Sequence, residues 1–170
     1  MQDALLSFCC IQDPDVEQFL RMKALDYERH GWCAVYLLLN EDKLEQGEIF
    51  IEAYFTLSHR SLIANPDKMS RSAITKYGGV SSAKTLNFVL IGQLGKYIRK
   101  TPIGYVRSFL SGHDILDYAF EVIYAATGLI PCKHTMVECK NIKKVVNMYT
   151  SYGFSFFQED GGLQQYCRKI

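Results

Sequence analysis

The sequence has no apolar run of the roughly 18 residues that a membrane-spanning helix needs. Its N-terminal stretch, MQDALLSFCC, lacks the basic region and long apolar core of a secretory signal. Internal repeats and low-complexity tracts are also missing. We therefore expect a cytoplasmic protein with no membrane partner.

Metal-binding patterns are absent too. The six cysteines include no CxxC pair, and the four histidines do not cluster with them. In a reducing compartment, such cysteines are expected mainly as small apolar core residues. We expect no metal.

The charge is nearly balanced, with a formal net charge of +1. This argues against a large nucleic-acid footprint, which usually shows as a strong basic excess. Local basic patches leave a nucleic-acid acceptor open. They are the stretch KYIRK and a second group made of Arg60, Lys68, Arg71, Lys76 and Lys84.

A length of 170 residues suits one domain with a full core. Periodicity and turn residues predict helices over 13–31, 113–128 and 141–153, and a short helix within 67–77. Strands are predicted over 7–11, 33–40, 48–59, 86–96, 132–139, 154–158 and 163–169, with a loop over 98–112. Residues 60–85 form an insertion between two strands. The strand–helix–strand order near the centre implies locally parallel strands within a mixed α/β sheet.

The stretch NFVLIGQLGKY begins as a buried strand and then contains Gly92 and Gly95. Glycine weakens a strand, because it costs backbone entropy and packs nothing. One interpretation is a bulge or bend on the way into a loop. The other is that a ligand lies against the backbone there.

A basic loop follows this strand and leads to the helix start Ser111-Gly112-His113-Asp114. A helix N-terminus can hold a phosphate, and basic side chains add charge-assisted contacts. A strand edge freed by a bulge can pair with an amide-containing ligand. Coenzyme A carries both groups. The alternative for Ser111 and Asp114 is a simple capping box.

This order of elements resembles the GNAT family of acetyl-CoA-dependent N-acetyltransferases, from about residue 7 to the C-terminus. The resemblance implies a single GNAT-like α/β domain over residues 1–170. Its sheet is mixed and mostly antiparallel, with a central splayed parallel strand pair, and is flanked by helices. The pyrophosphate pattern of the family matches RSFLSG at Arg107 and Gly112, but Leu110 stands where a glycine is expected. The cofactor-binding residues that the resemblance implies are Ile91, Gln93, Leu94, Gly95, Lys96, Arg107, Ser111, Gly112, His113, Asp114 and Asn141.

A second match lies in MYTSYGF, where Tyr149 stands four residues before Gly153-Phe154. In the family, a tyrosine at this place lies near the cofactor sulfur, so the resemblance assigns Tyr149 as the general acid that protonates the departing thiolate. The alternative is ordinary packing, which we assign to Tyr152. Glu138 and Glu52 are the candidate bases by location, and each is also explained as a solvated or ion-paired residue.

Within the family, the N-terminal half also looks like small bacterial acetyltransferase toxins that act on aminoacyl-tRNA. The acceptor amine therefore stays open between a small molecule, a protein and an aminoacyl-tRNA, and an antitoxin-type protein is a candidate partner. The aromatic C-terminal hairpin 154–169 either pairs with a second copy in a homodimer or covers the sheet, and both alternatives stay open. Specificity is expected in the helix 14–30 and the insertion 60–85. The competing hypothesis, which Leu110 supports, is a non-catalytic binding or regulatory protein with the same fold.

Overall fold

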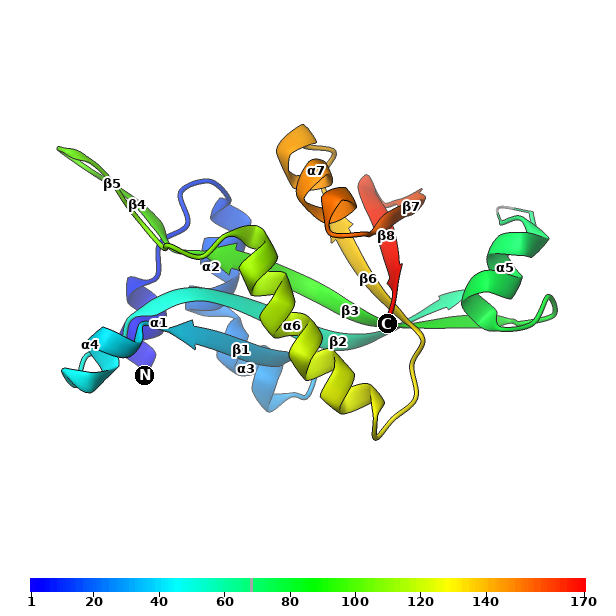
Figure 1. Ribbon diagram of the computed structural model, residues 1–170, viewed down its shortest axis with the longest axis horizontal. Helices are drawn as coiled ribbons and strands as arrows, with labels where there is room; N and C mark the ends of the chain where they lie inside the picture. Colours follow the sequence, from blue (N-terminus) through cyan, green and yellow to red (C-terminus); the bar gives the residue numbers. More distant parts are fainter. Residues whose placement is uncertain (68) are drawn as a thin grey trace. The chain divides into compact units, whose positions relative to one another are not determined.

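The computed structural model describes residues 1–67 and 69–170, so Lys68 of the predicted basic patch lies outside the described residues. The elements are labelled in Figure 1. The helices are α1 (Gln2–Ser7), α2 (Pro14–Met22), α3 (Ala24–Arg29), α4 (Glu41–Glu45), α5 (Arg71–Gly78), α6 (Gly112–Thr127) and α7 (Lys143–Ser151). The strands are β1 (Ala34–Leu39), β2 (Ile51–Ile63), β3 (Thr85–Lys96), β4 (Ile98–Thr101), β5 (Gly104–Arg107), β6 (His134–Cys139), β7 (Ser155–Asp160) and β8 (Leu163–Lys169).

The main sheet has the strand order β1-β2-β3-β6-β8-β7, and β4 and β5 form a separate two-stranded ribbon. Strands β3 and β6 are parallel, pairing Val89 to Ile91 with Thr135 to Val137. The pairs β1/β2, β6/β8 and β7/β8 are antiparallel. The predicted mixed, mostly antiparallel α/β sheet with one parallel pair is therefore confirmed. No helix in the described part of the chain is both long and apolar enough to cross a membrane.

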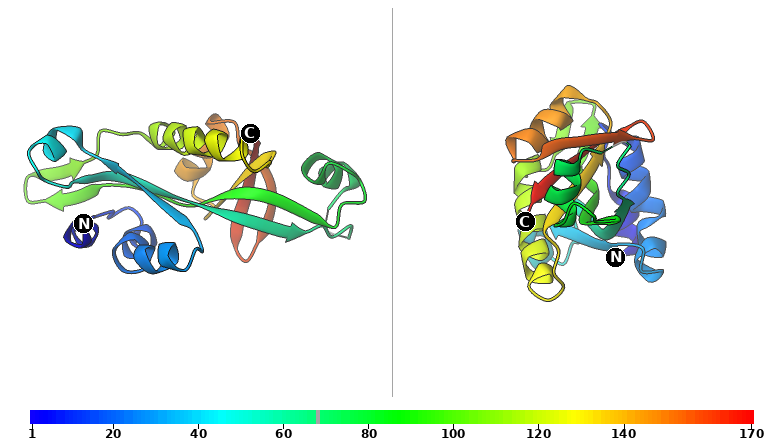
Figure 2. Two further views of the ribbon diagram at one scale, coloured as in Figure 1. Left: turned by 90° about the horizontal axis from the view of Figure 1, so that it is seen from below. Right: turned by 90° about the vertical axis from the view of Figure 1, so that its right-hand side faces the viewer.

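The chain forms two compact units, and the strands β2 and β3 each pass through both. The first unit contains residues Met1–Leu57 and Gly92–Ala119, and the second contains Ser58–Ile91 and Phe120–Ile170. Figure 2 shows β2 and β3 as long neighbouring strands joined through α5. The residue range 60–85, expected as an insertion, thus contains the end of β2, α5 and the start of β3.

The core of the first unit lies between the N-terminal helices and the sheet. The Phe8 ring packs edge-on against the rings of Tyr54 and Tyr97, with centroids 5.5 and 6.1 Å away. Leu20 from α2 is buried in the same cluster. The second unit has a core around Leu86 and Phe88 of β3, Met136 of β6 and Cys167 of β8.

Two N-terminal predictions are wrong. The strand predicted over 7–11 is absent because α1 occupies the chain up to Ser7, and Cys10 forms only an isolated bridge with Ile98. The helix predicted over 13–31 is two helices, since Lys23 leaves helical geometry at φ −122°. The start is as predicted: the Asp13 side chain accepts from the N–H groups of Asp15 and Val16, and Pro14 opens the helix.

Two predicted connections contain regular structure. The loop predicted over 98–112 holds the β4–β5 hairpin, which turns at Thr101-Pro102-Ile103-Gly104. Gly104 has φ +139°, a conformation that favours glycine. The polar stretch after β1 holds the short helix α4, whose N-cap Asn40 accepts from the Lys43 N–H. Both elements are too short to show a clear hydrophobic period in the sequence.

Candidate active site

Gly95 is explained by packing inside the first unit. A Cβ atom at this position would lie 2.4 Å from Val16 Cγ1 and 2.8 Å from Tyr54 Cε1. The Tyr54 hydroxyl of β2 also donates to the Val16 carbonyl at 2.7 Å, which holds α2 against β2. A glycine is therefore required at 95 so that α2 and Tyr54 can approach β3, whether or not a ligand binds nearby.

Beyond Ile91, the backbone N–H groups of β3 at one edge of the strand are hydrogen-bonded to β2. The Gln93 N–H donates to Thr56 Oγ1 at 2.9 Å, and the Tyr97 N–H donates to the Glu52 carbonyl at 2.8 Å, so both point toward β2. Because neighbouring residues of a strand alternate in direction, Leu94 directs its backbone groups to the opposite edge. Within the first unit β3 is the last strand of the sheet, and this is the edge at which an extended ligand would add.

Leu110, which stands where a glycine was expected, contributes both packing and hydrogen bonds to the fold. Its side chain is buried, its N–H donates to Ser108 Oγ at 3.1 Å, and its carbonyl accepts from Lys96 Nζ at 3.0 Å. The ammonium group of Lys96 therefore ties β3 to the loop before α6. This loop is held by its own side chains rather than left open.

The predicted capping box at the start of α6 is present. The Asp114 N–H donates to Ser111 Oγ at 3.1 Å, and the Ser111 N–H donates to Asp114 Oδ2 at 2.6 Å. The hydrogen bond from the Ser111 N–H, followed by hydrogen bonding from the Ser111 side chain, lowers the pKa of the Asp114 carboxyl, which is therefore ionised at neutral pH.

The fit of coenzyme A to these residues is uneven. The Leu94 backbone suits the amide arm. At the pyrophosphate position, however, the N–H groups of Leu110, Ser111 and Asp114 already have acceptors, and Asp114 adds a negative charge. A bound pyrophosphate would rely on the cations of the loop and on the rest of the helix start. It would also replace the bond between Ser111 and Asp114.

The cations of this region are exposed. Arg107 ends β5 with its guanidinium group 6.0 Å from the centre of the Tyr105 ring. Arg99 and Lys100 lie on β4 and are exposed as well, whereas Lys96, Gly112 and His113 are half-buried.

Tyr149 lies on α7 in the second unit and is buried. Its ring packs edge-on against Phe154 at 5.7 Å between centroids. Burial is the main cause that raises the pKa of Tyr149 well above its ordinary value, and Cys139 adds to it. The phenol therefore stays protonated at neutral pH, which is the state that a general acid requires. Tyr152 packs against Phe120 at 5.6 Å.

The two candidate bases are both engaged. Glu138 Oε1 accepts from Gln165 Nε2 at 2.6 Å and lies 3.5 Å from Arg60 Nη2. Glu52 is 5% exposed; its Oε1 accepts from Asn40 Nδ2 at 2.8 Å, and its Oε2 is buried without a partner. Each carboxylate therefore has a structural role whether or not it acts as a base.

The predicted site residues fall into two groups along the chain. Residues 93–114 of the predicted set belong to the first unit, where Lys96, Ser111 and Asp114 meet around one loop. Ile91, which is buried, and Asn141, which is exposed before α7, belong to the second unit together with Tyr149 and Glu138. Sequence reasoning missed Thr56, although a threonine within the apolar strand EAYFTL was a usable signal.

The cysteines are all free thiols, and Cys10, Cys139 and Cys167 are buried. Burial raises the pKa of Cys167 to about 12. The described residues include no group of three or more histidine, cysteine, aspartate or glutamate side chains placed to hold a metal ion.

The chain is similar in structure to several solved toxins. A structure described as a bacterial toxin aligns over 100% of this chain and 87% of its own, with a TM-score of 0.73 and 18% identity. A tyrosine-to-phenylalanine variant of the toxin AtaT, bound to the C-terminus of the antitoxin AtaR and acetyl-CoA, aligns over 99% and 89%, with a TM-score of 0.69 and 18% identity. AtaT complexed with acetyl-methionyl-tRNAfMet aligns over 95% and 85%, with a TM-score of 0.68 and 20% identity.

No family model matches the sequence, and no curated protein is similar to it in sequence at a significant level. The structural likeness extends over nearly the whole chain, although the sequences have diverged to below 25% identity. The chain has the GNAT fold, as its sequence predicted, and it shares this fold with the toxins described above.

Proposed function

We propose that this protein is an acetyl-CoA-dependent N-acetyltransferase that acetylates a primary amine. The observation that carries the proposal is the edge of β3 beyond Ile91, where Leu94 directs backbone groups away from β2. The basic loop and the start of α6 follow this edge directly in the chain. The likeness to AtaT bound to acetyl-CoA supports the same assignment.

The proposed reaction is direct transfer. The acceptor amine, in its neutral form, attacks the thioester carbonyl carbon of acetyl-CoA. The C–S bond then breaks as the amide forms, the thiolate takes a proton from the Tyr149 hydroxyl, and the amine proton passes to water or a carboxylate. A positioned general acid contributes about 10² to 10⁴ in rate.

For the acceptor, we propose an aminoacyl-tRNA as the first candidate to test. AtaT in complex with acetyl-methionyl-tRNAfMet has the same fold as this chain. The exposed cations on the β4–β5 hairpin, Arg99, Lys100 and Arg107, supply a local positive surface despite the balanced net charge. An antitoxin-type partner is proposed on the likeness to AtaT bound to AtaR.

The second candidate is a non-catalytic protein with the same fold. The bonds of Ser111 and Asp114 favour it, because they already use N–H groups that a pyrophosphate would need. Under this hypothesis the helix start is a completed cap, and acetyl-CoA does not bind.

The first test is calorimetric titration with acetyl-CoA and with dephospho-CoA. The enzyme hypothesis predicts micromolar binding that Arg107→Ala weakens by about tenfold, as expected for a lost charge-assisted contact. Arg29→Ala is the control, since Arg29 is an exposed arginine on α3 and is not among the residues proposed for acetyl-CoA. If folded protein shows no binding, the non-catalytic hypothesis replaces the enzyme hypothesis.

The second test measures release of free coenzyme A with aminoacyl-tRNA and with simple amines as acceptors. Tyr149→Phe should lower turnover at least about 10²-fold while the affinity for acetyl-CoA stays unchanged. Tyr152→Phe, the matched control three residues away, should retain turnover. Normal turnover of the Tyr149→Phe variant would remove the general acid from the mechanism.

A further inference from the structure

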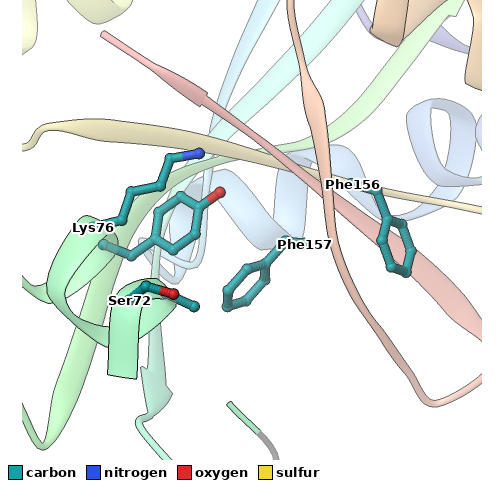
Figure 3. A pocket seen from close by; sticks show the side chains of 6 residues that line it. Ser72, Lys76, Phe156 and Phe157 are labelled. Carbon is teal, nitrogen blue, oxygen red and sulfur yellow. The ribbon is translucent and has the colours of Figure 1, made fainter. Parts of the chain in front are cut away.

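A pocket of about 260 Å³ lies in the second unit between α5 and β7. Figure 3 shows Ser72 and Lys76 on one side of this pocket and Phe157 beside them, with Phe156 on the other side of the β7 ribbon. The lining residues are Ser72, Ala73, Lys76, Tyr77, Phe156 and Phe157. None of them belongs to the residues proposed above for acetyl-CoA or for catalysis.

The α5 wall of the pocket is held in place by packing. The Tyr77 ring lies 4.8 Å from Phe157, 5.0 Å from His134 and 5.8 Å from Phe88, measured between centroids. At the next residue, a Cβ on Gly78 would lie 2.4 Å from Ala83 Cβ, so α5 approaches the chain leading into β3 as closely as a glycine allows. The Tyr77 ring is therefore held in place by its packing contacts and forms an aromatic wall of the pocket.

The β7 wall is shaped by a bulge. The register shifts between Phe156, opposite Tyr166, and Gln158, opposite Gln165, so Phe157 has no partner on β8. Successive side chains of a regular strand point to opposite faces, and a bulge re-aims them. Both Phe156 and Phe157 line the pocket, but the Phe156 ring lies on the other side of the β7 ribbon, where it packs against Tyr166 and is 56% exposed.

Lys76 supplies a positive charge at this aromatic surface. Its amino group lies 5.0 Å from the centre of the Tyr77 ring, and no carboxylate of the described residues is within ion-pairing distance of it. Burial, followed by the charges of Lys76, Lys169 and Lys133, lowers the pKa of His134 beneath Tyr77. The region is therefore electropositive, and Ser72 adds a hydroxyl that shares a hydrogen bond of 2.9 Å with Ser70.

We propose that this pocket binds a small aromatic carboxylate, with its ring against Phe157 and Tyr77 and its carboxylate on Lys76. Aromatic rings stack or meet edge-on with favourable energies beyond simple burial. A cation without a carboxylate partner at the rim gains one from an anionic ligand. The volume, slightly below that of pockets for drug-sized ligands, suits one or two fused rings. The ligand would bridge α5, which lies in the insertion 60–85, and the C-terminal hairpin.

The test uses two probes of the same shape, 2-naphthoate and the neutral 2-naphthamide, titrated into the full-length protein and followed by backbone amide NMR. We expect 2-naphthoate to bind about fivefold more tightly, the upper range for a partly exposed ion pair. The shift changes should centre on residues of α5 and β7. Lys76→Met keeps the alkyl stem and should bring the two probes to equal affinity, whereas Lys84→Met, at an exposed lysine outside the pocket, should keep the difference.

A second variant tests the aromatic wall. Phe157→Leu should weaken both probes by a similar factor and leave the preference for naphthoate unchanged. Equal affinities in the wild-type protein, shift changes centred away from α5 and β7, or no binding of naphthoate at millimolar concentration would each overturn the proposal.

Discussion

Gly95→Ala separates the two explanations of the glycine in the central strand. The added methyl group would lie 2.4 Å from Val16 Cγ1 and 2.8 Å from Tyr54 Cε1, closer than carbon atoms approach in proteins. Tyr54 is fully buried, and its hydroxyl is bonded to the Val16 carbonyl, so neither neighbour yields without a loss of packing. The substitution therefore overpacks the core of the first unit.

The magnitude follows from two opposing terms. Overpacking costs about 1 to 3 kcal/mol, and the clash with two fixed neighbours places this site at the upper end. Replacing glycine by alanine stabilises by about 0.4 to 1 kcal/mol through the unfolded chain. The net loss is about 2 kcal/mol in the free energy of unfolding, which corresponds to a decrease in Tm of about 4 to 8 °C for a chain of this size.

The assay is urea unfolding followed by circular dichroism, with Gly128→Ala as the control. The Cβ of an alanine at 128 would meet only ordinary contacts at 3.4 and 3.6 Å. Val16→Ala removes the closest clashing atom, so the double variant should recover part of the loss that Gly95→Ala causes. Full stability of Gly95→Ala combined with lost acetyl-CoA binding would refute packing as the reason for this glycine.

Three further outcomes follow from the structure. Gln165→Leu should cost about 2 kcal/mol in urea unfolding, because the buried Gln165 side chain donates to Glu138 and accepts from Gln158, and both partners lose a bond; unchanged stability would contradict this. Asp114→Asn should lower the free energy of unfolding at pH 6 and leave it unchanged in strong acid. Folding lowers the pKa of the Asp114 carboxyl from 3.8, so the stability that the carboxylate contributes is complete above pH 3.8 and is lost as the pH falls through the lowered pKa. A difference in stability from wild type that persists in acid would count against the cap. Iodoacetamide at pH 8 should label the half-buried Cys132 before Cys167, whose pKa is raised to about 12 by burial; mass spectrometry of native protein showing the reverse order would contradict the described core.

Much of the fold was readable from the sequence because its signals are local. The Asp13-Pro14 start of α2, the apolar run before Gly92 and the Gly153 stop after α7 each specify structure by short-range chemistry. The errors lie where tertiary contacts decide. Phe8 packs between Tyr54 and Tyr97, so a stretch with strand-like composition follows a helix and forms only one bridge.

The candidate site was readable only in part for the same reason. Sequence spacing gives Ser111 and Asp114 as a cap, and it also places Lys96 before the loop. Sequence spacing does not reveal that Lys96 donates a hydrogen bond to the Leu110 carbonyl, or that the Thr56 hydroxyl accepts one from the Gln93 N–H. Both hydrogen bonds join residues far apart in the chain. The packing role of Gly95 likewise depends on Val16, which no local pattern connects to it.

The two strands that pass through both units have a consequence for biosynthesis. The first unit needs residues from Met1–Leu57 and from Gly92–Ala119, so it is incomplete on the ribosome until α6 has emerged. Until β3 has emerged, β2 has no partner at the edge that β3 later occupies, and such open edges are prone to aggregate. A nascent chain stalled before residue 92 should therefore recruit chaperones, and neither unit should survive as a separately expressed fragment.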